Sequence, residues 1–89
     1  MFLQMYEEEK NLPLIIEFRR DDGRPFPLAN ASITLEVGSL TLNGEIVSST
    51  QGKVKFIIPS LSKGRYNTKI TLKVGSQTFI YDKLVIEVL

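Results

Sequence analysis

The stretch Gly64-Arg65-Tyr66-Asn67-Thr68-Lys69-Ile70-Thr71-Leu72-Lys73-Val74 has the clearest periodicity in this 89-residue chain. From Tyr66 to Val74, every second side chain except Thr68 is apolar or aromatic. The five intervening positions, which begin at Arg65, hold no apolar residue. Alternate side chains of an extended chain point to opposite faces, so this pattern is typical of a strand with one buried and one solvated face. The stretch therefore favours an all-β fold.

Other parts of the chain alternate in the same way. These stretches are Leu12–Phe18, Ile33–Val37, Val54–Ile58 and Leu84–Val88. Pro13 interrupts the first of them, and because proline lacks an N–H donor we expect that strand to begin there or to lie at a sheet edge. About seven short strands with turns every roughly 8–12 residues predict a β-sandwich, with a small barrel as the alternative.

Glycines mark the turns between these strands. Asp22-Gly23 lies in a polar stretch, and Gln51-Gly52 precedes the strand at Lys53. Asn43-Gly44 lies between two apolar stretches and predicts a tight hairpin that joins residues 40–42 to residues 45–47. Gly64 precedes Tyr66 by two residues at the start of a strand, which is typical of the tyrosine corner of Greek-key sandwiches. We expect the Tyr66 hydroxyl to bond a nearby backbone group, as a structural rather than a catalytic feature.

The composition excludes several classes of function. Hydrophobic residues make up 43% of the chain, and 11 basic against 10 acidic residues give a net charge of +1. A charge so close to zero argues against a nucleic-acid-binding protein. Cysteine and histidine are absent, which excludes disulfides, thiolate zinc sites and histidine-dependent catalysis. We expect a single non-enzymatic domain over residues 1–89, without a cofactor.

The N-terminal residues 1–11 form either a strand or an arm. The chain shows no secretory signal and no stretch of the ~20 apolar residues that span a membrane, so we expect synthesis in the cytoplasm. Phe2 and Tyr6 belong to an apolar segment that is followed by the acidic run Glu7-Glu8-Glu9. The favoured interpretation is that this segment packs on the protein's own sheet. The alternative is an arm that adds a strand to a neighbouring subunit.

Charge is unevenly distributed along the chain. Residues 1–52 carry four basic and eight acidic groups, whereas residues 53–89 carry seven basic and two acidic groups. This asymmetry predicts an association of like subunits that weakens as salt rises. Lys53, Lys55, Lys69 and Lys73 fall on the solvated faces of two strands, and they make one basic sheet face if those strands are neighbours. Such a face either keeps an exposed sheet soluble and discourages the pairing of its edges with other strands, or it binds a partner.

Asp21-Asp22, with Glu17 nearby, is the one acidic cluster placed in a loop. The favoured interpretation is a solvated turn, because Asp-Gly sequences are common in turns. The alternative is a partial calcium site, since calcium takes several oxygen ligands. The EF-hand spacing is missing and three arginines surround the pair, so we expect no metal here.

Taken in order, these features resemble a known family. A strand at Leu14–Phe18 is followed by Arg20–Pro25 and Leu28, then by stretches at residues 31–37, 45–47 and 52–56, by Gly64–Tyr66, and by a closing strand at residues 84–88. This order is similar to the immunoglobulin-like N-terminal domain of phage baseplate upper proteins and of related small virion domains. The resemblance covers roughly residues 12–88, and it implies an immunoglobulin-like antiparallel sandwich of about seven strands.

The resemblance also implies a function. It implies a structural role in a virion, in which the domain docks on a tail tip or baseplate through contacts with other protein subunits, and it implies no catalytic residues. The family's downstream linker and receptor-binding module are missing, so we expect a free-standing adaptor or decoration subunit, or an excised domain, and a homo-oligomer. The alternative function is a carbohydrate- or cell-surface-binding module, for which Phe79 and Tyr81 are the candidate residues.

Overall fold

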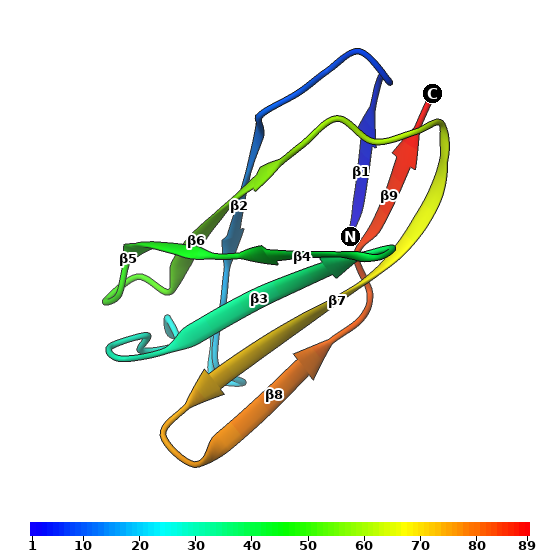
Figure 1. Cartoon of the computed structure of the whole chain (residues 1–89). Coiled ribbons are helices and arrows are strands. Elements are labelled where there is room, and N and C mark those ends of the chain that lie inside the picture. Colours follow the sequence, from blue (N-terminus) through cyan, green and yellow to red (C-terminus); the bar gives the residue numbers. More distant parts are fainter.

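The computed structural model describes all 89 residues as nine strands without a helix (Figure 1). The strands are β1 (Phe2–Met5), β2 (Leu12–Glu17), β3 (Ser32–Val37), β4 (Leu40–Asn43), β5 (Glu45–Ser48), β6 (Lys53–Ile58), β7 (Gly64–Val74), β8 (Gln77–Tyr81) and β9 (Val85–Val88). They form two sheets that pack together, which confirms the all-β, sandwich-like prediction with nine strands instead of about seven. No segment has the form of a helix able to cross a bilayer.

The larger sheet has six strands, in the order β1-β9-β7-β3-β4, with β8 also paired to β7. Its β1–β9 pair is parallel, so the sheet is mixed rather than purely antiparallel as the resemblance implied. A parallel pair needs a long connection between its strands. Because β1 and β9 lie at opposite ends of the chain, the rest of the chain provides that connection.

The smaller sheet consists of β2, β6 and β5 in that order, all antiparallel. β2 is an edge strand and contains Pro13, in agreement with the prediction that proline places this strand at an edge. The register of β5 against β6 shifts between Ile46 and Ser48, so this edge is irregular.

The core lies between the two sheets. Alternate positions of β3, β6, β7 and β9 are buried there, as the period of two predicted, whereas Arg65, Asn67, Lys69 and Lys73 on the other face of β7 are exposed. The buried apolar cluster comprises Met5, Ile16, Leu28, Ile33, Leu35, Val37, Val54, Phe56, Ile58, Leu61, Ile70, Leu72, Leu84, Ile86 and Val88. Two of these, Leu28 and Leu61, come from connecting segments without periodicity, and the sequence did not mark them.

The predicted Asn43-Gly44 hairpin is wrong. β4 pairs with β3 in the larger sheet and β5 pairs with β6 in the smaller one, so the chain changes sheets at Gly44. A Cβ atom at Gly44 would lie 2.6 Å from Cγ1 of Val54, and glycine therefore lets the backbone cross close to the core. The hairpin of this region joins β3 to β4 at Gly38, where φ is 58°.

β8 and β9 lie one after the other along the same side of β7. Between the Ile70–Tyr81 pair and the Asn67–Val85 pair, β7 has two residues and the opposite segment has three. This extra residue is a β-bulge. The buried Thr68 of β7 secures it, because its Oγ1 and its backbone N–H both donate to the carbonyl oxygen of Leu84, at 2.8 and 3.2 Å.

Candidate interaction site at the open edge of the sandwich

The loop between β2 and β3 forms one wall of a groove along the side of the sandwich between β2 and β8, and we call this side the open edge. Gly52 anchors its start, because the Phe18 N–H donates to the Gly52 carbonyl at 2.8 Å. A Cβ atom at Gly52 would lie 2.4 Å from the Phe18 carbonyl oxygen, so this anchor requires glycine. The loop then folds back on itself at Gly23, where φ is 84°, and the Phe26 N–H donates to Phe18 at 2.9 Å. These backbone hydrogen bonds hold Phe26 in position at the open edge of the sandwich.

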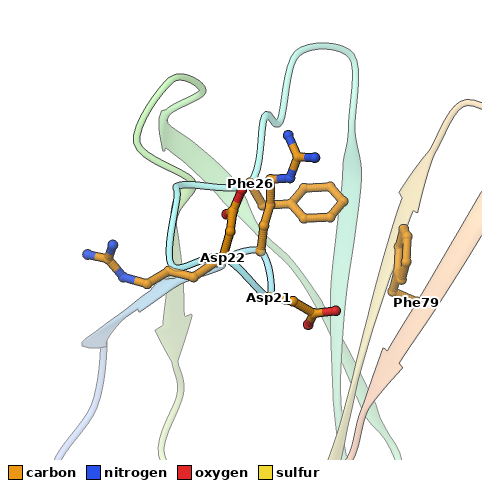
Figure 2. A pocket seen from close by; sticks show the side chains of 6 residues that line it. Asp21, Asp22, Phe26 and Phe79 are labelled. Carbon is orange, nitrogen blue, oxygen red and sulfur yellow. The ribbon is translucent and has the colours of Figure 1, made fainter.

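The largest groove of the molecule lies between this loop and β8. It has a volume of about 440 Å³ and is lined by Arg19, Arg20, Asp21, Asp22, Phe26 and Phe79. Phe26 and Phe79 meet edge to face, with their ring centroids 5.3 Å apart and their planes at 76° (Figure 2). This geometry is a favourable one for two aromatic rings. The groove therefore combines an aromatic pair with charges of both signs.

A second groove of about 260 Å³ adjoins the first at Arg19. It is lined by Met1, Ile16, Glu17, Phe18, Arg19 and Tyr81. Both grooves follow the side of the sandwich between β2 and β8. Tyr81 and Phe79 pair with Ile70 and Leu72 and so share the inward face of the larger sheet, yet they stay 37% and 41% exposed. The smaller sheet therefore does not extend over β8.

Two acidic residues of this region, Glu17 and Asp22, lie beside basic neighbours. Glu17 accepts a 2.9 Å hydrogen bond from Arg19 and lies 3.7 Å from Lys53, and these contacts lower the pKa of its carboxyl, Arg19 contributing most. Asp22 accepts the backbone N–H of Arg24 at 3.0 Å, which is typical of a turn. No three potential metal ligands of the chain come together.

The four lysines of the predicted basic face lie on two different sheets. Lys53 and Lys55 belong to β6 of the smaller sheet, whereas Lys69 and Lys73 belong to β7 of the larger one. Three of them lie beside carboxylates on neighbouring strands: Lys53–Glu17 at 3.7 Å, Lys55–Glu45 at 3.6 Å and Lys69–Glu36 at 3.9 Å. They do not form one basic face, because the two strands that carry them are not neighbours.

The N-terminal segment is a strand of the protein's own sheet. Leu3 and Met5 of β1 pair with Ile86 and Val88 of β9, and Met5 is buried. Phe2 lies on the outward face and is 55% exposed, and Tyr6 follows the strand and is also exposed. β1 therefore packs inward along one face and presents Phe2 to solvent on the other.

Tyr66 lies near the start of β7 and folds back over the segment that precedes this strand. Its hydroxyl donates a 2.7 Å hydrogen bond to the carbonyl oxygen of Ser62, four residues upstream. Gly64, where β7 begins, has a φ of 150°. This contact ties the β6–β7 connection to the larger sheet.

Phe26 is the residue of the larger groove that sequence reasoning missed. Phe26 stands between Pro25 and Pro27, outside every alternating stretch, so no periodicity marks it. An aromatic residue flanked by two prolines in a polar loop is the one sequence signal that would have found it.

Comparison with known proteins finds no match to this chain among family models, curated proteins or solved structures.

Proposed function

We propose that this protein is a non-catalytic assembly module that acts through contacts with other proteins, and that it is a phage or prophage virion component of the tail, baseplate or decoration type. One observation supports a binding role above all. Eleven large hydrophobic side chains are exposed in a chain of 89 residues. Extended apolar surface on a small domain is typical of a protein–protein interface.

Eight of these eleven side chains come from three parts of the molecule. Phe79, Ile80 and Tyr81 belong to β8, and Met1, Phe2 and Tyr6 belong to the N-terminal segment. Ile15 and Ile57 lie on the outward face of the smaller sheet, where the pairing of Pro13 with Ile57 places them diagonally opposite. Association with other subunits removes such surface from water and stabilises a domain of this size.

The virion assignment depends on the order of strands and turns. A tyrosine whose hydroxyl returns to the backbone four residues upstream supports an immunoglobulin-like sandwich, although the parallel β1–β9 pair is an addition to that arrangement. The order from residue 12 to residue 88 then supports the likeness to small virion domains.

The test is co-purification of the tagged protein with each product of the neighbouring genes. We expect a stable complex with a tail or capsid protein. The double variant Ile15→Ser/Ile57→Ser and the variant Phe2→Ser each remove one exposed group, and at least one of them should weaken the complex. Failure to bind any neighbouring gene product would contradict the proposal.

A second candidate function is glycan binding, and the groove at Phe26 and Phe79 favours it. Sugars bind to aromatic rings beside carboxylates and guanidinium groups, and this groove holds all three. Binding on a glycan array that is lost in Phe79→Ala would support this function. An array without a hit would exclude it.

A further inference from the structure

β8 is an edge strand without the protection that edge strands ordinarily carry. Its residues Gln77-Thr78-Phe79-Ile80-Tyr81 are all exposed, and none of them is charged or proline. Soluble proteins usually protect a free edge with charge, proline, a bulge or a covering segment, because unpaired N–H and C=O groups attract another strand. β8 pairs with β7 along one side and has no strand on the other (Figure 1).

The other sheet edges are less available. β2 contains Pro13 and ends at Glu17, and β5 is interrupted by a register shift. β4 leads directly into the crossing at Gly44 and lies against β6. β1 is short and lies beside β9, so its position relative to β8 decides the shape of the edge.

β1 and β8 together give the larger sheet a stepped edge. The Met1 amine donates to the Lys83 carbonyl at 3.2 Å, and the Val85 N–H donates to the Met1 carbonyl at 3.0 Å. β1 therefore begins just past the end of β8 and lies one strand further out, beside β9. The position beside β8 in that outer row is empty, and it is five residues long.

We propose that a second copy of this chain fills the empty position, through antiparallel pairing of the two β8 strands around a two-fold axis. The inference rests on the proposed role in assembly, and it identifies a second copy of the chain as one of the protein's partners. A stepped edge is complementary to itself, because each β8 fills the other's empty position and each Met1 meets the partner's β7–β8 turn. The five uncharged residues bring no like charges together.

The side chains of β8 also favour this pairing. Phe79 and Tyr81 lie on the inward face and stay partly exposed, although Phe79 contacts Phe26, and the second copy brings its own Phe79 and Tyr81 opposite them. Aromatic side chains on facing strands stabilise the pairing of those strands. An isologous contact of this kind closes as a dimer and does not propagate into a filament.

Light scattering after size-exclusion chromatography tests the dimer. We expect a dimer that forms with rising concentration, and Ile80→Lys should weaken self-association by about tenfold or more, since charge at an edge opposes pairing. Val47→Lys is the matched control, because Val47 is 52% exposed and Ile80 is 61% exposed but the two lie on different sheets. Circular dichroism verifies that both variants fold.

Single cysteines test the geometry, because the natural chain has none. In a two-fold antiparallel pair one residue lies opposite its own copy, within the ~7 Å between Cα atoms that a disulfide allows. Among Thr78→Cys, Phe79→Cys and Ile80→Cys, we expect at least one to form a disulfide-linked dimer under mild oxidation. Thr41→Cys is the control, since Thr41 is exposed at the opposite edge of the larger sheet, on the same outward face as Thr78 and Ile80.

The inference is overturned by a protein that stays monomeric at millimolar concentration, by a dimer that Ile80→Lys leaves intact, or by cross-linking at Thr41→Cys equal to that on β8. These outcomes are distinct from failure of the proposed function. A monomer that still binds a neighbouring tail protein overturns the β8 dimer alone, whereas a β8 dimer that binds no such protein overturns the virion role alone.

Discussion

At the scale of single residues, Tyr66 connects two parts of the chain that no strand pairing joins. The 2.7 Å bond from its hydroxyl to Ser62 holds the β6–β7 connection against the start of β7. A net contribution of about 0.5–1.5 kcal/mol is typical of such a bond, because the unfolded chain exchanges it for bonds with water.

We therefore expect Tyr66→Phe to lower the free energy of unfolding by about 1 kcal/mol, as measured by urea denaturation. The ring still packs in this variant, so the loss reports on the hydroxyl alone. Tyr6→Phe is the control, because the exposed Tyr6 hydroxyl makes no hydrogen bond within the chain. An equal loss in both variants would contradict the role of the Ser62 bond.

Glu17 makes the stability depend on pH. Its hydrogen bond and ion pair with Arg19, together with the charge of Lys53, lower the pKa of its carboxyl in the folded state. A carboxyl whose pKa is lower in the folded than in the unfolded chain stabilises the fold above the unfolded pKa. That contribution is lost as pH falls through the folded pKa.

Glu17→Gln should accordingly lower the urea midpoint at neutral pH, and the difference from the natural protein should shrink as the solution becomes acidic. Urea titrations across the acid range measure this. Glu8→Gln is the control, because Glu8 is exposed and makes no ion pair. A difference for Glu17→Gln that is the same at every pH would exclude an electrostatic origin.

At the scale of elements, the chain crosses from one sheet to the other at Asn43-Gly44, so that β4 joins the larger sheet and β5 joins the smaller one. Asn-Gly between apolar stretches is a strong hairpin signal, yet β4 and β5 pair with strands of different sheets. Both strands carry only short apolar stretches, and each finds a longer partner in β3 or β6. Gly44 serves here through its missing Cβ atom, because its φ is not positive.

Gly44→Ala should cost about 1–3 kcal/mol of stability, since the new methyl group meets Val54 at 2.6 Å and the Phe56 ring at 3.0 Å. The cost should fall in a Val54→Ala background, where the nearest atom is gone. Gly75→Ala is the control, because its φ is 60° but no atom lies within 4 Å. The penalty at Gly75 should not depend on Val54, and a double-mutant cycle by urea denaturation measures both couplings.

At the scale of the whole molecule, folding interleaves the acidic first half of the chain with the basic second half. β2 lies beside β6 and β3 lies beside β7, and three ion pairs join the two halves. Three of the eight acidic groups of the first half thereby lie beside lysines of the second half. These pairs reduce the charge asymmetry that is available to steer one subunit toward another.

Self-association through β8 should therefore be nearly independent of salt, in contrast to the expectation from the charge asymmetry of the sequence. The dissociation constant should change by less than about twofold between low salt and about 0.5 M NaCl, because the contact contains no charged pair for the salt to screen. Sedimentation at several salt concentrations measures it. A dimer that dissociates as salt rises would point instead to the lysine-bearing strands as the interface.

The alternation of apolar residues predicted the strands and most of the core. Ile33, Leu35 and Val37 are buried, as are Val54, Phe56 and Ile58, because a period of two places every second side chain on one face. The same reasoning missed Phe26 and Leu28, since the positions of loop residues depend on where the loop is anchored. It also missed the groove, whose walls come from segments more than fifty residues apart.

The sequence by itself determined that this chain is all-β, which faces of its strands are buried, and that Tyr66 lies at a corner near the start of its longest strand. The tertiary structure alone decided which strands are neighbours. It placed Lys53 and Lys69 on different sheets, turned Asn43-Gly44 into a crossing, and left one side of β8 without a neighbouring strand. The physical reason is that a period of two specifies the face to which a side chain points, whereas strand order is settled by burying all of these faces at once.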